Sequence, residues 1–143
     1  MLKSLYESDF YAWTQKQAQL LRSAQLDDLD LLHLAEELED MGRSEKRELA
    51  SRLEVLLMHL LKWQWQPNLR SRSWQLTIKE QRLRLVKHLA ENLSLKALLS
   101  DYLESSYQLA MLSAERETGL DSYPGGCPYT LEQVLNPDFL PEP

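Results

Sequence analysis

Apolar residues, most of them leucines, recur three and four positions apart along most of the chain. This is the spacing of one face of an α-helix, and it predicts five helical segments followed by a tail. The first segment begins at a capping residue, Ser8 or Asp9, and the second begins at Asp27. The third runs from about residue 45 to residue 66 and ends before Pro67, because the residue that precedes a proline avoids the helical conformation.

The third segment has the widest apolar face, and we predict that it is the central helix of the fold. Gly42 lies between the second and third segments, where it marks either a stop or a bend. The two segments are therefore either separate helices or one long helix bent at Gly42. The face of the second segment comprises Leu31, Leu34, Ala35 and Leu38, and that of the third comprises Leu49, Leu53, Leu56, Leu57, Leu60 and Leu61.

Two more long segments and a short helix follow. The fourth segment begins at Ser71 or Ser73, and the fifth begins at a capping Ser94 and closes at Gly119. The chain after residue 119 is rich in Pro and Gly, and residues 130–133 fit a capping box, which predicts a short helix near residues 131–135. The apolar stripe predicted for the fifth segment comprises Leu95, Leu98, Leu99, Tyr102, Leu109 and Leu112.

Composition supports an all-α fold. The 143 residues include 32 Leu but only 3 Val and 1 Ile, and β-branched residues are those that favour strands. We predict a four- to five-helix bundle with a central Leu-rich helix and a Pro/Gly-rich C-terminal tail that ends in a short helix. The length fits a single helical domain over residues 1–143, with residues 1–119 as the bundle core and residues 120–143 as a tail packed on it.

The same composition excludes several classes of protein. A single cysteine, Cys127, excludes an intrachain disulfide and a zinc site built on paired thiolates. The most apolar stretch, residues 55–61, is too short to span a bilayer, and the N-terminal residues lack the apolar core of a signal peptide. We therefore expect a cytoplasmic protein that does not associate with a membrane.

Charge is segregated along the chain, although the net charge is only −6. Residues 27–40 carry seven acidic side chains and no Lys or Arg, whereas residues 62–96 carry eight basic and two acidic ones. The two segments could pair within the fold, pair with those of another subunit, or leave the basic segment for an anion such as a phosphate backbone. Trp63, Trp65 and Trp74 interleave with Lys62 and Arg70, a mixture that suits nucleic acid.

Helical geometry makes nucleic-acid binding the less favoured interpretation. At 100° per residue Lys79, Arg84 and Lys87 scatter around the fourth segment and do not form one stripe. Arg82 lies on the core side, where an arginine usually pairs with a buried carboxylate.

Candidate chemistry centres on three histidines. His33, His59 and His88 fall on three different segments, but no segment offers a pair of ligands such as H-x-x-x-H, so we predict no metal site and no cofactor. Catalytic motifs such as G-x-S-x-G and H-E-x-x-H are absent, which favours a protein that is not an enzyme. His59 continues a polar stripe through Glu45, Glu48 and Arg52, which is either a site that lines a groove or the exposed side of the central helix.

Several long motifs carry a family resemblance. They are residues 34–47 (LAEELEDMGRSEKR), 56–64 (LLMHLLKWQ), 70–74 (RSRSW) and 127–135 (CPYTLEQVL), together with Tyr6, Asp9, Phe10, Tyr11 and Trp13. In these motifs the chain resembles a mostly cyanobacterial family catalogued as domain of unknown function number twenty-nine. The resemblance implies an all-helical single domain from a cyanobacterial cytosol. It carries no established activity, substrate or cofactor.

The resemblance directs attention to one polar and aromatic set. Its members are Glu36, Glu37, Arg43, Glu45, His59, Lys62, Trp63, Arg72 and Trp74. Glu36 and Glu37 diverge by about 100° on a helix, so only one of them can face inward, and the sequence does not indicate which.

Taken together, these features favour a non-enzymatic protein-interaction module with a protein partner or with self-association. Two alternatives stay open. One is nucleic-acid or phosphate-ligand binding through residues 62–87. The other is a small metal-dependent enzyme that uses His59 and carboxylates such as Glu36 or Glu37.

Overall fold

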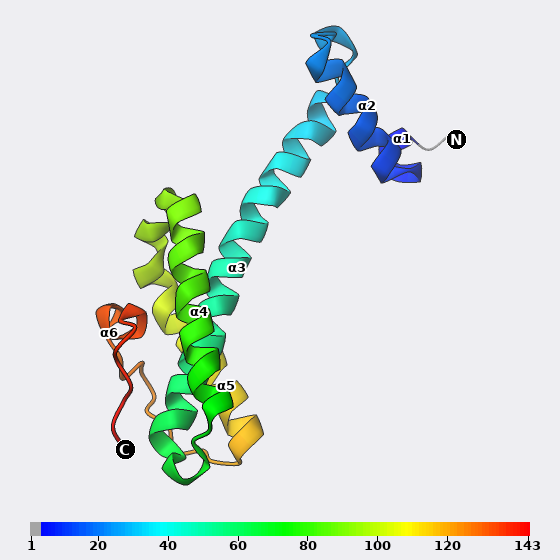
Figure 1. Ribbon diagram of the computed structural model, residues 1–143. Coiled ribbons are helices and arrows are strands. Elements are labelled where there is room, and N and C mark those ends of the chain that lie inside the picture. The colour runs from blue at the N-terminus through cyan, green and yellow to red at the C-terminus, as the bar shows by residue number, and fades with distance from the viewer. Residues whose placement is uncertain (1–3) are drawn as a thin grey trace. The chain divides into compact units, whose positions relative to one another are not determined.

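The computed structural model describes residues 4–143, and every regular element in that range is helical (Figure 1). The predicted all-α fold is confirmed. The α-helices are α1 (Leu5–Ser8), α2 (Phe10–Arg22), α3 (Leu31–Trp65), α4 (Arg72–Glu91), α5 (Leu99–Thr118) and α6 (Leu131–Leu135). The 3₁₀ turns between them are η1 (Leu26–Asp28), η2 (Pro67–Leu69) and η3 (Leu93–Leu98).

Side-chain caps fix the ends of several helices where the sequence predicts them. The Asp9 carboxylate accepts the backbone N–H of Ala12 at the start of α2, and the Ser71 hydroxyl accepts that of Trp74 at the start of α4. Thr130 and Gln133 form the complete capping box of α6. Gly119 closes α5 with φ of 75°, a left-handed conformation that glycine adopts without strain.

The second and third predicted segments form one helix of 35 residues, α3. Gly42 lies inside this helix and does not break it. A single glycine costs about 1 kcal/mol of helix stability relative to alanine, which the hydrogen-bonded turns on both sides tolerate. The helix ends at Trp65, two residues before Pro67, as proline requires.

The predicted apolar face of the fifth segment is wrong in part. The chain forms the 3₁₀ turn η3 where the sequence predicts the first helical turn, and Leu109 and Leu112 are half-exposed. The predicted Leu95 and Leu99 are buried, but the rest of the buried face comprises Ser106, Tyr107, Ala110 and Ala114 of α5. The Ser106 hydroxyl donates to the Ala50 carbonyl of α3, so it is the small residues of α5 that approach the central helix. Counting leucines alone missed this face.

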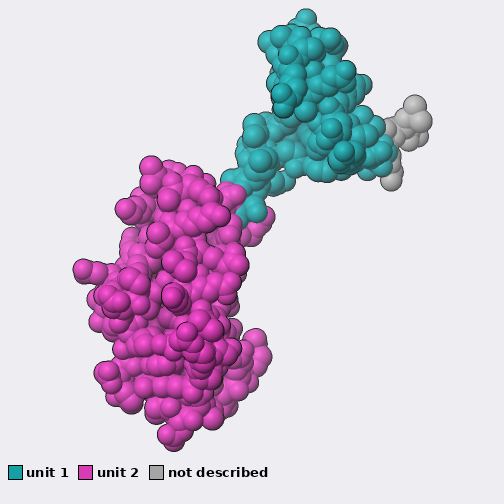
Figure 2. Space-filling view, viewed as in Figure 1, with its two compact units in different colours: residues 1–44 teal, residues 45–143 magenta. Residues whose placement is uncertain are grey.

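The chain divides into two compact units, unit 1 (residues 1–44) and unit 2 (residues 45–143) (Figure 2). Unit 2 contains the hydrophobic core, and all six leucines predicted for the third segment are fully buried in it. Helix α4 adds Ile78, Leu85 and Leu89, and the tail adds Tyr123, Tyr129 and Val134. The single domain expected over residues 1–143 stays a prediction.

Unit 1 buries few side chains. Only Trp13, Gln17 and Leu20 are buried among its described residues. Two residues of the predicted second face, Leu31 and Leu38, are 68% and 66% exposed. Within residues 4–143, none of the helices combines the length and the apolar character that crossing a bilayer requires.

Candidate functional site

Lys62 is the centre of one cluster of predicted site residues in unit 2. Its side chain is buried, and its ammonium group lies 2.6 Å from the Glu117 carboxylate and 4.7 Å from the centre of the Trp74 ring. Glu117 comes from α5, so this ion pair joins α3 to α5 across 55 residues of sequence. Both contacts are made by the ammonium group, so the charge of this buried lysine is paired.

His59 lies one turn before Lys62 on α3. Its Nδ1 is 2.9 Å from the carbonyl oxygen of Val55, and since a carbonyl only accepts, Nδ1 carries the proton. Burial holds the pKa of His59 below its ordinary value of 6.5, and the nearby Lys62 ammonium acts in the same direction. His59 is therefore a half-buried imidazole that favours the neutral state.

Trp63 and Arg72 belong to the end of α3 and the start of α4. The Arg70 guanidinium stacks over the Trp63 ring at 4.8 Å and donates from Nε to the Trp63 carbonyl oxygen. Arg72 donates to the Gln75 side chain on the exposed surface of α4. The Arg70 contacts tie the connection to the end of α3, whereas the Arg72 contact lies within α4.

Glu36, Glu37 and Arg43 lie in unit 1, in and around an aromatic cluster. Glu37 accepts a hydrogen bond from the Tyr6 hydroxyl, which raises the pKa of Tyr6 to about 12. Glu36 is exposed, so Glu37 is the glutamate of the two that faces a partner. Arg43 pairs with Asp40 and Glu39, and all three side chains are more than half exposed.

The aromatic cluster of unit 1 includes His33, which the sequence presents only as a possible metal ligand. The His33 ring stacks on the Tyr6 ring with centroids 3.9 Å apart, and its Nδ1 lies 2.7 Å from the Asp30 carboxylate. The hydrogen bond to Asp30 raises the pKa of His33 above 6.5 and, in the same contact, lowers the pKa of Asp30 below 3.8. Trp13 donates from its indole N–H to the same carboxylate.

Glu45 lies in a third place, on the side of α3 that faces α4 in unit 2. Its carboxylate and that of Glu48 face the buried His88 ring of α4. Of the described residues, only Glu45, Glu48 and His88 bring three metal-type ligand atoms within 4.8 Å of one another. Neither His33 nor His59 belongs to this group, so the structure brings the nine predicted residues to three places and not to one site.

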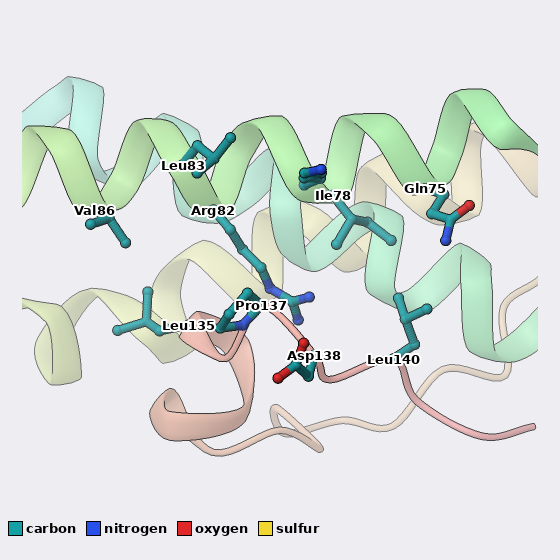
Figure 3. Close-up of a pocket in the computed structure, with 10 residues that line it drawn as sticks. Gln75, Ile78, Arg82, Leu83, Val86, Leu135, Pro137, Asp138 and Leu140 are labelled. Carbon is teal, nitrogen blue, oxygen red and sulfur yellow. The ribbon is translucent and has the colours of Figure 1, made fainter.

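A groove lies between α4 and the C-terminal segment of unit 2 (Figure 3). It has a volume of about 420 Å³ and is lined mainly by apolar side chains, among them Ile78, Leu83, Val86, Leu135 and Leu140. The Arg82 side chain extends from α4 toward Pro137 and Asp138 in this view. Its Nε donates to the Val134 carbonyl oxygen at 2.9 Å, so the predicted pairing of Arg82 with a buried carboxylate is replaced by a bond to the end of α6.

Sequence reasoning missed His88 as a partner of Glu45 and Glu48. The signal that was present is the i, i+3 spacing of the two glutamates, which places them on one face of α3. The register between α3 and α4 brings His88 opposite that face, and helix periodicity does not specify this register. The same holds for the groove, because Leu135 and Leu140 come from the tail.

Comparison with known proteins gives a family but no characterised relative. No curated protein and no solved structure matches the chain at a significant level. One family model, described as domain of unknown function DUF29, matches residues 5–140, which is almost the entire chain. The motifs identified in the sequence lie within the matched range. The chain therefore belongs to the DUF29 family.

Proposed function

We propose that this protein is a helical interaction module that self-associates, with unit 1 of one copy packing on unit 2 of a second copy. The observation that carries the proposal is an apolar face on the first part of α3 that is largely exposed among the described residues. We call it the unit 1 stripe, and it comprises Leu31, Leu34, Ala35, Leu38 and Met41. Leu31, Leu38 and Met41 are each more than 60% exposed. Burying one leucine contributes about 1.5–3 kcal/mol, so a partner that covers the stripe would gain substantially.

The second copy offers a matching surface on α4. Three apolar residues and two lysines share one exposed face of this helix, which we call the α4 outer face: Leu76, Lys79, Leu83, Val86 and Lys87. Leu83 is 63% and Val86 is 57% exposed, and both also line the groove of Figure 3. The surface is therefore apolar, slightly hollowed and basic.

Charge complementarity favours a second copy as the occupant. Around the helix, Glu37 and Glu39 of the acidic segment flank the unit 1 stripe, whereas the α4 outer face carries Lys79 and Lys87, and Glu80 beside them is paired with Arg84. Opposite charges around two apolar surfaces favour their association and disfavour the pairing of either surface with itself. If each copy gives its stripe and receives the other, the two contacts close into a symmetric dimer.

Light scattering coupled to size exclusion tests the proposal on the full chain. We expect a dimer or larger assembly, and we expect Leu38→Glu in the stripe and Leu83→Glu on the α4 outer face each to weaken it strongly. Leu112→Glu on α5 is the matched control, because Leu112 is 51% exposed and lies on neither surface. All three positions are exposed, so the substitutions leave the folded core intact.

Mixing the two variants gives a sharper result. A Leu38→Glu chain keeps an intact α4 outer face, and a Leu83→Glu chain keeps an intact stripe, so an equimolar mixture recovers one contact per pair. A wild-type chain that is monomeric overturns the proposal. An assembly that the mixture fails to restore, or that Leu112→Glu disrupts equally, overturns this interface.

The basic side chains of residues 62–87 bear on the alternative of nucleic-acid binding. Three basic side chains of residues 62–87 are already engaged, since Lys62 pairs with Glu117, Arg82 bonds the end of α6, and Arg84 pairs with Glu80. This supports ranking nucleic-acid binding below self-association. A metal-dependent activity of His59, a cytoplasmic location and a cyanobacterial source also stay predictions.

A further inference from the structure

Glu45, Glu48 and His88 form a small cluster that the proposed self-association does not use. The two glutamates lie one helical turn apart on α3, and His88 faces them from α4. Nδ1 of His88 is 3.5 Å from Oε2 of Glu45 and 3.4 Å from Oε2 of Glu48. Three potential ligand atoms thus converge on one point from two packed helices.

The other nitrogen of His88 fixes the state of the ring. Nε2 lies 3.0 Å from the backbone carbonyl oxygen of Glu45, and since that oxygen can only accept, Nε2 carries a proton. In a neutral imidazole Nδ1 then holds a lone pair, and this lone pair points at two carboxylates that are acceptors as well. His88 is only 5% exposed, so this side of the cluster is closed to solvent, and the two carboxylates form its open side. Either a proton on Nδ1 or a metal cation among the three atoms satisfies this arrangement.

We propose that Glu45, Glu48 and His88 bind one divalent transition-metal ion, such as Zn²⁺, Mn²⁺, Fe²⁺ or Co²⁺. One imidazole with two carboxylates is a donor set for this class of metal, whereas Mg²⁺ and Ca²⁺ prefer oxygen alone. In a tetrahedral site with bonds of about 2.1 Å, neighbouring ligand atoms lie about 3.4 Å apart. The two distances from Nδ1 match this spacing. The two carboxylate charges balance the charge of the ion.

The surroundings of the cluster suit a metal site. The carbonyl of Glu45 that accepts from Nε2 orients the ring, which is the usual outer contact of a metal-bound histidine. Arg52 donates to Oε1 of Glu48 at 3.2 Å and leaves Oε2 directed at His88. The Glu45 and Glu48 side chains are 47% and 43% exposed, so an ion can reach them from solvent and water can complete its coordination.

Neighbouring cations set a limit on affinity. Arg84 and Lys87 line the same depression, together with Glu91. Arg84 is paired with Glu80, which reduces its effect on an ion at the cluster. We expect one ion per chain, held by three protein ligands. A water molecule that exchanges with solvent occupies the remaining coordination position.

Cobalt titration of the full-length, untagged chain tests the site. Co²⁺ in a site of this kind gives visible d–d absorption, and calorimetry with Zn²⁺ gives the stoichiometry. We expect one ion per chain and at least a tenfold loss of affinity in Glu48→Gln and in His88→Gln. Glu115→Gln is the matched control for a glutamate outside the cluster, because Glu115 is exposed on α5, and we expect this variant to bind as the wild type does.

The glutamate variants keep the test decisive if the buried His88 cannot be replaced without unfolding. The Glu45 and Glu48 side chains are partly exposed, and Gln has the same shape as Glu, so Glu45→Gln and Glu48→Gln remove a charge without opening the core. Failure to bind Co²⁺ or Zn²⁺ at neutral pH overturns the proposal and leaves the three side chains as a structural contact between α3 and α4. Binding that persists unchanged in Glu48→Gln overturns it as well.

Discussion

Unit 1 and unit 2 are both helical, but they differ in what covers their apolar side chains. The contrast is clearest along α3, which contributes to both units with the same three- and four-residue spacing of leucines. In unit 2 its leucines from Leu49 to Leu61 are fully buried, whereas in unit 1 Leu31 and Leu38 are about two-thirds exposed. The spacing specifies which face of the helix is apolar. Burial depends on whether other elements pack on that face.

The two units also differ in the kind of internal contact that stabilises each of them. Unit 2 has α4, α5 and the tail to supply a core of leucine, tyrosine and alanine side chains. Unit 1 relies on a cluster of rings, Tyr6, Phe10, Trp13 and His33, tied by hydrogen bonds to Asp30 and Glu37. Polar and aromatic contacts of this kind position groups well but bury less apolar surface than a leucine core does. Unit 1 is therefore the part of the chain best suited to gain stability from a partner.

Removing one leucine from each unit should give the largest difference between them. Leu57→Ala leaves a cavity in the core of unit 2 and should lower the free energy of unfolding by about 2–5 kcal/mol. Leu38→Ala in unit 1 should change it by no more than about 0.5 kcal/mol in the dissociated chain, because Leu38 is already exposed. Denaturant unfolding followed by far-UV circular dichroism measures both values.

The comparison fails if the two substitutions cost similar amounts at a chain concentration where no assembly is present. A large loss in Leu38→Ala under those conditions would mean that the stripe is covered within one chain. A loss that appears only at high concentration would instead support association through the stripe.

Most of the fold could be predicted from the sequence because caps, prolines and apolar spacing are signals that lie within or next to each helix. Asp9, Ser71 and Thr130 cap helices where the sequence places them, and Pro67 follows the end of α3. The sequence also allowed one long helix through Gly42. The face of α5 was mispredicted because it depends on Ala110 and Ala114, whose small side chains carry little hydrophobic signal.

The candidate sites were much harder to predict. Lys62 meets Glu117 across 55 residues, and Nε2 of His88 meets the carbonyl of Glu45 across 43. Such pairs depend on the register between packed helices, which the spacing within one helix does not determine. The resemblance to a family selected residues such as His59 and Glu37, but these lie in different units and have no common partner.

Arg82 tests how strongly unit 2 depends on a single polar contact. Arg82→Met keeps most of the side-chain volume but removes the charged bond to the Val134 carbonyl, and it should cost about 1.5–3 kcal/mol of stability. Arg84→Met on the same helix is the control. Its exposed ion pair with Glu80 should contribute no more than about 1 kcal/mol.

Thermal and denaturant unfolding compare the two arginine variants, and limited proteolysis of the tail shows whether α6 has detached. If the Arg82→Met variant unfolds like the wild type, and its tail resists proteolysis as well as the wild-type tail does, apolar packing of Val134 alone holds α6 in place. The tail would then belong to the core of unit 2 through apolar contacts alone.

The smallest effect, and the one most specific to the comparison, is the response of the two units to pH. The hydrogen bond to Asp30 raises the pKa of His33 above 6.5 in unit 1, whereas burial lowers the pKa of His59 below 6.5 in unit 2. A raised histidine pKa stabilises the fold below 6.5, and that contribution disappears as the pH rises through the folded pKa. A lowered pKa has the opposite sign, so His59 destabilises the fold as the pH falls below 6.5.

Two-dimensional NMR of the histidine ring protons reports both titrations in one sample. We expect the His33 midpoint above 6.5, the His59 midpoint below it, and a fall of the His33 midpoint alone in Asp30→Asn. The same carboxylate also limits the acid side, because the lowered pKa of Asp30 means that its contribution disappears as the pH falls below 3.8. The contact between His33 and Asp30 should therefore be strongest between about pH 4 and pH 6.5. Midpoints that coincide would contradict the opposite effects of the Asp30 contact on His33 and of burial on His59.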